Sequence, residues 1–278
     1  AMLYIAGASD RLGRVADGNT VLDFDSEEKR RKSSVSSAIA ALEWDNTKLN
    51  IIDAPGLFDF EGGAAEAVRA AEAVLIVTSA GSGVDVGTEK AFRAAEKKGA
   101  AKFFAVTKTD SDHRNFYKTF DALKEVYGNK LCPTIIPYME GNITKCYVNL
   151  MTGMAFSYDE NGKATKVPVP EDSVIEEMTS AFMEAVATTD DALMEKFFEG
   201  EKFTKEEILK VFSTARFTPY TRYPVLPAQA LISSFTALHG PHPVHSVMQA
   251  KNAPMKTARR VFYPATKTVR SQPSASRR

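Results

Sequence analysis

The stretch LNIIDAPG at residues 49–56 decides the fold of this chain of 278 residues. It opens with a short apolar run, reaches a carboxylate at Asp53 and turns at Pro55 and Gly56. A short apolar run that ends at a Pro-Gly turn is typical of a buried strand. Similar runs follow at residues 73–78, 103–106 and 134–136, with helical patterns at residues 64–73, 88–98 and 115–127. Apolar strands that alternate with helices predict an α/β fold with a mostly parallel sheet between helices.

Downstream of this core, residues 146–210 have a different pattern. Two runs with strand character flank Asn161 and Gly162, and Asn-Gly between such runs is a strong signal for a hairpin turn. An acidic helical pattern then continues to the end of this segment. We therefore expect a core over residues 1–145 and an appended α+β subdomain over residues 146–210.

The last segment, residues 211–278, contains ten Lys or Arg residues, eight of the thirteen prolines and no Asp or Glu. Because the whole chain has no formal net charge, this tail carries about +10 and the rest about −10. Its apolar residues have neither helical nor strand spacing, so we expect it to be disordered. Two interpretations stay open. The favoured one is an out-of-frame product that begins near residue 211, and the rival is a basic arm that binds RNA non-specifically through phosphate contacts.

Composition excludes several classes of protein. No stretch of about 20 apolar residues is present, so we expect no membrane span. The first residues lack the charged start and long apolar centre of a signal peptide. Two cysteines, Cys132 and Cys146, provide neither a disulfide framework nor a metal-ligand cluster. We therefore expect a cytoplasmic protein.

The first candidate site follows the opening strand, at residues 53–56. A carboxylate at a strand end, such as Asp53, can hold Mg²⁺ through water, because this hard cation prefers oxygen ligands. A glycine such as Gly56 lets a backbone N–H approach a γ-phosphate with no side chain in the way. By itself the pattern is weak evidence, because a Pro-Gly turn after a strand is common.

The second candidate site is the segment TKTD at residues 107–110, which also follows an apolar strand. The Asp110 carboxylate could accept two hydrogen bonds from a guanine base, in a pattern that adenine does not offer. The stem of Lys108 could lie across the base. A helix-capping turn would explain the segment equally well if it stood alone. Both segments at strand ends, in this order, favour a nucleotide site.

Taken together, these segments make the chain resemble the G domain of elongation factor G, from just after its phosphate-binding loop through its inserted subdomain. Residues 51–60, IIDAPGLFDF, resemble the family's IIDTPGHVDF, and residues 107–110 resemble NKxD. Further similar segments lie at residues 7–15, 23–25, 27–31, 81–89 and 168–170. The resemblance covers residues 1–210, leans toward the elongation-factor-G-like branch and ends near Lys210.

This resemblance implies a P-loop NTPase-like G domain that binds GTP or GDP with Mg²⁺ and couples GTP hydrolysis to a step on the ribosome. It implies Mg²⁺ ligands at Asp53 and at Ser34, which stands where the family has a threonine. The nucleotide-binding residues that it implies are Asp53, Ala54, Pro55, Gly56, Leu57, Thr107, Lys108, Thr109 and Asp110.

The departures from the family pattern are equally informative. The 278 residues contain no G-x-x-x-x-G-K-[ST] segment, whose backbone N–H groups and lysine grip phosphates, and the sheet strand before it is also missing. Leu57 stands at the position where the family has a water-positioning histidine, so no catalytic residue is assigned. Thr107 stands where the family has an asparagine. We therefore expect weak or no GTPase activity. The alternative is a non-enzymatic remnant, a module that associates with RNA or the ribosome through the basic tail.

Overall fold

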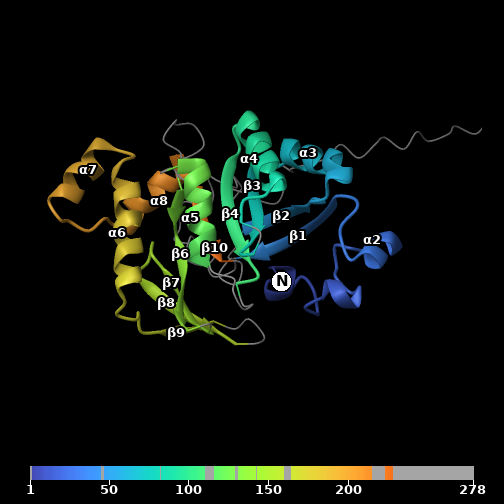
Figure 1. Ribbon diagram of the computed structural model, residues 1–278, viewed down its shortest axis with the longest axis horizontal. Coiled ribbons are helices and arrows are strands. Elements are labelled where there is room, and N and C mark those ends of the chain that lie inside the picture. The colour runs from blue at the N-terminus through green and yellow to red at the C-terminus, as the bar shows by residue number, and fades with distance from the viewer. Residues whose placement is uncertain are drawn as a thin grey trace, which may run out of the picture.

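The computed structural model describes residues 2–44, 47–81, 83–109, 116–128, 131–141, 143–159, 164–214 and 223–227. Figure 1 shows three parts side by side: a hairpin of strands β1 (Ala38–Trp44) and β2 (Thr47–Asp53) near the N-terminus, a central sheet, and a second sheet with helices α6 (Ser173–Ala187) and α7 (Asp191–Phe198) on its outer side. Over the described residues, no helix combines the length and apolarity that crossing a membrane requires.

The central sheet is parallel, as predicted. Its strands follow the order β3 (Ala73–Ser79), β4 (Ala101–Thr107), β10 (Tyr223–Pro227) and β5 (Leu131–Pro133). The helices of this part are α3 (Glu61–Ala70), α4 (Val86–Lys98) and α5 (Phe116–Tyr127). Local signals fix their ends: Asp85 caps α4 by accepting the N–H of Thr88, and Gly99 ends it in the left-handed region at φ 71°.

The core lies between this sheet and its helices and continues into the second sheet. Phe104 of β4, Phe116 of α5 and Phe182 have no exposed surface. The ring of Tyr127 packs 4.2 Å from that of Phe92 and 5.3 Å from that of Phe104, measured between centroids. One hydrophobic cluster contains buried residues from both sheets, so the second sheet packs on the first as part of one core.

Strand β10 differs from the expectation of a tail without regular structure at its own five residues, 223–227. Residues 223–227 pair in parallel with β4 on one side and with β5 on the other, and helix α8 (Lys205–Thr214) crosses the boundary predicted at residue 210. The sequence conceals this strand because two of its five residues are prolines, which normally argue against a central strand. Pairing with two neighbours outweighs that local signal.

Strands β1 (Ala38–Trp44) and β2 (Thr47–Asp53) differ from the prediction. They form an antiparallel pair, whereas residues 49–53 were expected in the parallel sheet. Among the described residues, this pair forms no ladder with β3, so the two sheets are separate. Strand β1 has an apolar run at residues 38–42, but three of these five residues are alanines, which are depleted in strands, so the run does not mark a strand clearly.

The second sheet is antiparallel, in the order β6 (Ile135–Glu140), β7 (Ile143–Asn149), β8 (Met154–Tyr158) and β9 (Ala164–Val167). The pairing of β8 with β9 confirms the predicted hairpin, although its turn lies outside the described residues. Residues 134–136 were expected in the parallel sheet, but Ile135 and Ile136 belong to β6, because the chain changes sheets at Thr134. Three helices follow: α6 (Ser173–Ala187), α7 (Asp191–Phe198) and α8.

Candidate functional site

The first site lies at the end of β2, where Asp53 is the last residue of the strand. Burial raises the pKa of the Asp53 carboxyl, and the negative charges of Asp23 and Glu28 raise it further. These two residues come from the segment around helix α2 (Ser26–Arg31), so this segment and the end of β2 share one acidic neighbourhood. Such a neighbourhood favours a cation.

Asp23 connects this carboxylate cluster to Ser34. The Ser34 Oγ donates a hydrogen bond of 2.8 Å to Asp23 Oδ1, and the Thr20 Oγ1 donates one of 2.8 Å to Asp23 Oδ2. The Ser34 oxygen keeps its lone pairs while its proton is held by Asp23, so it can still act as a ligand. Asp23 therefore contacts Ser34 directly, and its charge also acts on the Asp53 carboxyl.

The donors in this region suit Mg²⁺ bound together with a phosphate ligand. In the described part of the chain, no group of three or more His, Cys, Asp and Glu side chains is arranged to hold a metal ion. Mg²⁺ needs no such cage, because it usually takes one or two carboxylates, several waters and substrate phosphates. Asp53 and Ser34 therefore fit a site that the nucleotide would complete.

The loop after Asp53 leaves room for a ligand. A Cβ placed on Gly56 would have no atom within 4 Å, so the space beside this glycine is open. Ala54 and Pro55 complete the turn, and Leu57 precedes the short 3-10 helix η2 (Phe58–Phe60) with 48% of its surface exposed. An exposed leucine can neither accept nor donate a proton, so this position supplies no acid–base group.

The second site lies at the end of β4. The Thr107 Oγ1 donates a hydrogen bond of 3.0 Å to the Thr78 carbonyl, and the Ala80 N–H donates one of 2.9 Å to the Thr107 carbonyl. Threonine at this position therefore still ties β4 to the end of β3. Lys108 has φ 56°, in the left-handed region. This backbone conformation is uncommon for residues other than glycine, and it is enriched at ligand sites. Thr109 is buried, and Asp110 lies outside the described residues.

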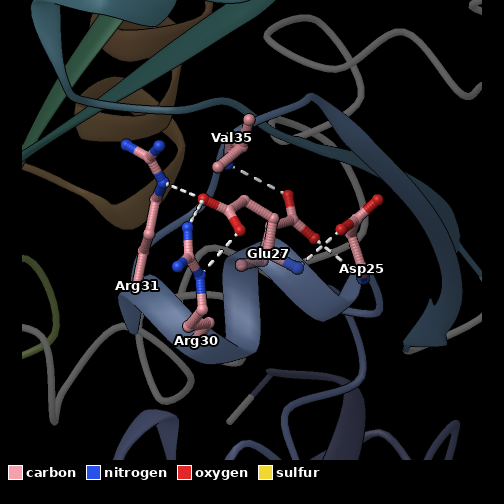
Figure 2. Close-up of polar contacts among 6 residues, drawn as sticks. Asp25, Glu27, Arg30, Arg31 and Val35 are labelled. Atoms are coloured by element: carbon pink, nitrogen blue, oxygen red, sulfur yellow. Dashed lines mark hydrogen bonds and ion pairs between the residues drawn. The ribbon is translucent and has the colours of Figure 1, made fainter.

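Sequence reasoning missed Asp23 and Glu28 as site residues. Both lie in a charged run at residues 23–32, where side chains are usually solvated, and Glu27 fits that description. In Figure 2, Arg30 and Arg31 both point to Glu27, and their hydrogen bonds lower its pKa to about 2. A local signal for Glu28 does exist: it stands three residues after Asp25, the spacing of a capping box, and the structure contains both bonds of that box.

Asp53 gives a prediction about the protein without Mg²⁺. Because its pKa is raised in the folded state, Asp53 contributes stability at acidic pH that is lost as the pH rises through the folded pKa. We expect Asp53→Asn to have a melting temperature about 2–4 °C higher at pH 7 in EDTA, and we expect this gain to disappear below pH 4. Thermal unfolding followed by circular dichroism at both pH values would check this. An equal or lower melting temperature at pH 7 would contradict it.

Comparison with known proteins points to one family for most of the chain. The family described as "Elongation factor Tu GTP binding domain" matches residues 1–238, so the resemblance extends well beyond the end predicted at Lys210. The match continues past residue 211, where the out-of-frame segment was expected to begin, and it includes β10. The fold is that of a translational GTPase G domain.

Individual relatives agree with the family match. Proteins named "Elongation factor G-like protein" from two Mycobacterium tuberculosis strains, CDC 1551 / Oshkosh and ATCC 25618 / H37Rv, are each 30% identical over 213 residues. The aligned stretch covers 76% of this chain and 29% of each relative, so the chain spans less than a third of their length. The crystal structure of ttk003000868 from Thermus thermophilus aligns with a TM-score of 0.76 and 31% identity, over 88% of this chain and 38% of its own.

Proposed function

Because this chain belongs to the elongation factor Tu GTP-binding domain family, we propose that it is a guanine-nucleotide-binding unit whose Mg²⁺ site is formed by Asp53 and Ser34. One observation carries the proposal: Asp53 ends β2 in an acidic neighbourhood with Asp23, which in turn holds the Ser34 hydroxyl at 2.8 Å. An ionised carboxylate is costly there without a cation, and bound Mg²⁺ would neutralise it.

Each site residue has a separate role in this proposal. Mg²⁺ would neutralise charge on the phosphates, while Asp53 and Ser34 orient the ion through water or directly. The backbone N–H of Gly56 would face the γ-phosphate across the open space beside it. The stem of Lys108 would lie across the base, and Asp110 would accept the hydrogen bonds that distinguish guanine from adenine.

We further propose that the 278 residues by themselves bind the nucleotide weakly and hydrolyse it slowly. They contain no G-x-x-x-x-G-K-[ST] segment, and this loop supplies most of the phosphate contacts in P-loop proteins. Leu57, at the position of the family's histidine, cannot position or polarise the attacking water. Coupling of hydrolysis to a step on the ribosome is proposed for the whole protein, by its relationship to the elongation factors.

A titration with GTP and ATP, each with Mg²⁺ and with EDTA, tests the proposal. We expect binding in the micromolar to millimolar range that prefers GTP to ATP and weakens in EDTA. Gly56→Ala serves as the diagnostic variant, because a Cβ there meets no atom of the protein and the fold should be unaffected. We expect it to weaken GTP binding more than GDP binding. Absence of binding at millimolar GTP would contradict the proposal and favour a non-enzymatic module.

A further inference from the structure

Glu28 is a buried carboxylate on a short surface helix. It lies in the six-residue helix α2 and has only 1% of its surface exposed. Glutamate is almost never fully buried unless partners satisfy its charge, because desolvation of an ion is costly. Its neighbour Glu27 lies on the same helix, stays partly exposed and pairs with Arg30 and Arg31. The two adjacent glutamates therefore have different roles.

The partners of Glu28 are N–H and O–H groups of the chain itself. Its Oε1 accepts hydrogen bonds from the backbone N–H of Val35 at 3.0 Å and of Ser36 at 3.2 Å, and from the Ser36 Oγ at 3.4 Å. Its Oε2 accepts the backbone N–H of Asp25 at 3.1 Å. The bond to Val35 is drawn in Figure 2, where it links helix α2 to the segment that precedes β1. One carboxylate thus joins two separate stretches of backbone.

These bonds keep Glu28 ionised in spite of its burial. Burial by itself would raise the pKa of Glu28, but the N–H groups of Val35, Ser36 and Asp25 hold the pKa below its usual value. Hydrogen bonds to a charged group are about twice as strong as those between neutral groups. Glu28 is therefore a firm anchor for the segment at residues 34–36.

We propose that Glu28 is a positioning residue, which fixes the backbone at Val35 and Ser36 and so holds the Ser34 hydroxyl on Asp23. Ser34 comes directly before the two anchored N–H groups, and its own bond to Asp23 measures 2.8 Å. The anchoring itself follows from the structure without any ligand. Its consequence for Mg²⁺ rests on the proposed function.

Hydrogen exchange of the ligand-free chain tests the anchoring directly. We expect the Val35 and Ser36 amides to exchange at least about tenfold faster in Glu28→Ala than in the unaltered chain, because they lose a charged acceptor. Glu28→Gln, which keeps the shape and one acceptor oxygen, should show a smaller acceleration and serves if the alanine variant does not fold. Glu27→Gln is the matched control on the same helix and should leave both amides unchanged. The amide of Phe104 in β4 reports on the rest of the fold.

A second measurement separates the proposal from the proposed function. The affinity for GTP is measured in Mg²⁺ and in EDTA for the unaltered chain, Glu28→Gln and Glu27→Gln. We expect Glu28→Gln to lose most of the increase in GTP affinity that Mg²⁺ gives, while its affinity for GTP in EDTA stays unchanged. General damage to the fold would lower the affinity for GTP both in Mg²⁺ and in EDTA. If the unaltered chain binds no GTP, the proposed function fails. Hydrogen exchange alone then tests whether Glu28 anchors the backbone at Val35 and Ser36. Unchanged exchange at Val35 and Ser36 in both Glu28 variants, with β4 still protected, would overturn the proposal.

Discussion

Adding a strand and a G-x-x-x-x-G-K-[ST] loop ahead of residue 1 is expected to raise the affinity of this chain for GTP by at least about 100-fold. The added loop would supply several backbone N–H donors and a lysine to the phosphates. A hydrogen bond to a charged group contributes about 1.5–3 kcal/mol. Two such bonds give about 3 kcal/mol or more, and each 1.4 kcal/mol is a tenfold change in affinity.

The described structure offers a place for the added segment. The β1–β2 pair and the central sheet are separate, with no ladder between β2 and β3 in the described residues. Strand β3 also carries apolar side chains that are unusually exposed, since Leu75 is 37% and Val77 58% accessible. An added strand and the helix after its loop would lead directly into helix α1 (Met2–Ile5), whose Leu3 packs with Leu42 and Leu49 of the β1–β2 pair.

Calorimetric titration of GTP into the extended chain would measure this gain. The control is the same extension with the loop lysine replaced by alanine, which keeps the added strand but removes the charge on the phosphates. Two results would contradict the view that binding is weak because phosphate contacts are missing. The extension could stabilise the fold without raising the affinity for GTP, or it could raise that affinity equally with and without the lysine.

Two strands of the parallel sheet, β3 and β4, were predictable because they carry their signal locally. Residues 73–78 and 103–106 are short apolar runs, and they lie within β3 (Ala73–Ser79) and β4 (Ala101–Thr107). Residues 107–110 could be assigned to a strand end for the same reason. The pairing of residues 49–53 was not predictable, because an apolar run shows burial and does not show which strand lies beside it.

Features that depend on distant partners escaped the sequence. The prolines Pro224 and Pro227 argue against a central strand. Residues 223–227 form such a strand only because they pair with β4 and β5. Glu28 has the spacing of a capping box, which predicts its bond to the Asp25 N–H. Its bonds to Val35 and Ser36 depend on how the chain returns after helix α2, and no local pattern encodes that return.

The central sheet that carries the second site depends on the packing of Phe104. This side chain is fully buried on β4, three residues before Thr107, and its ring lies 6.1 Å from that of Phe92 and 5.3 Å from that of Tyr127. Its backbone position pairs with Ile76 on one side and Val225 on the other. A cavity at this position would therefore affect three strands and two helices at once.

Phe104→Ala is expected to lower the free energy of unfolding by about 3–5 kcal/mol, the cost of removing a buried phenylalanine ring and leaving a cavity. Phe198→Ala is the matched control, because Phe198 is 79% exposed and its loss should cost no more than about 0.5 kcal/mol. Urea unfolding followed by circular dichroism would compare the two midpoints. Total stability is commonly only about 5–15 kcal/mol, so Phe104→Ala should also weaken GTP binding by leaving part of the protein unfolded. Equal midpoints for the two variants would mean that β4 is not the centre of the cooperative core, and the end of β4 would then need another support for the base-binding segment.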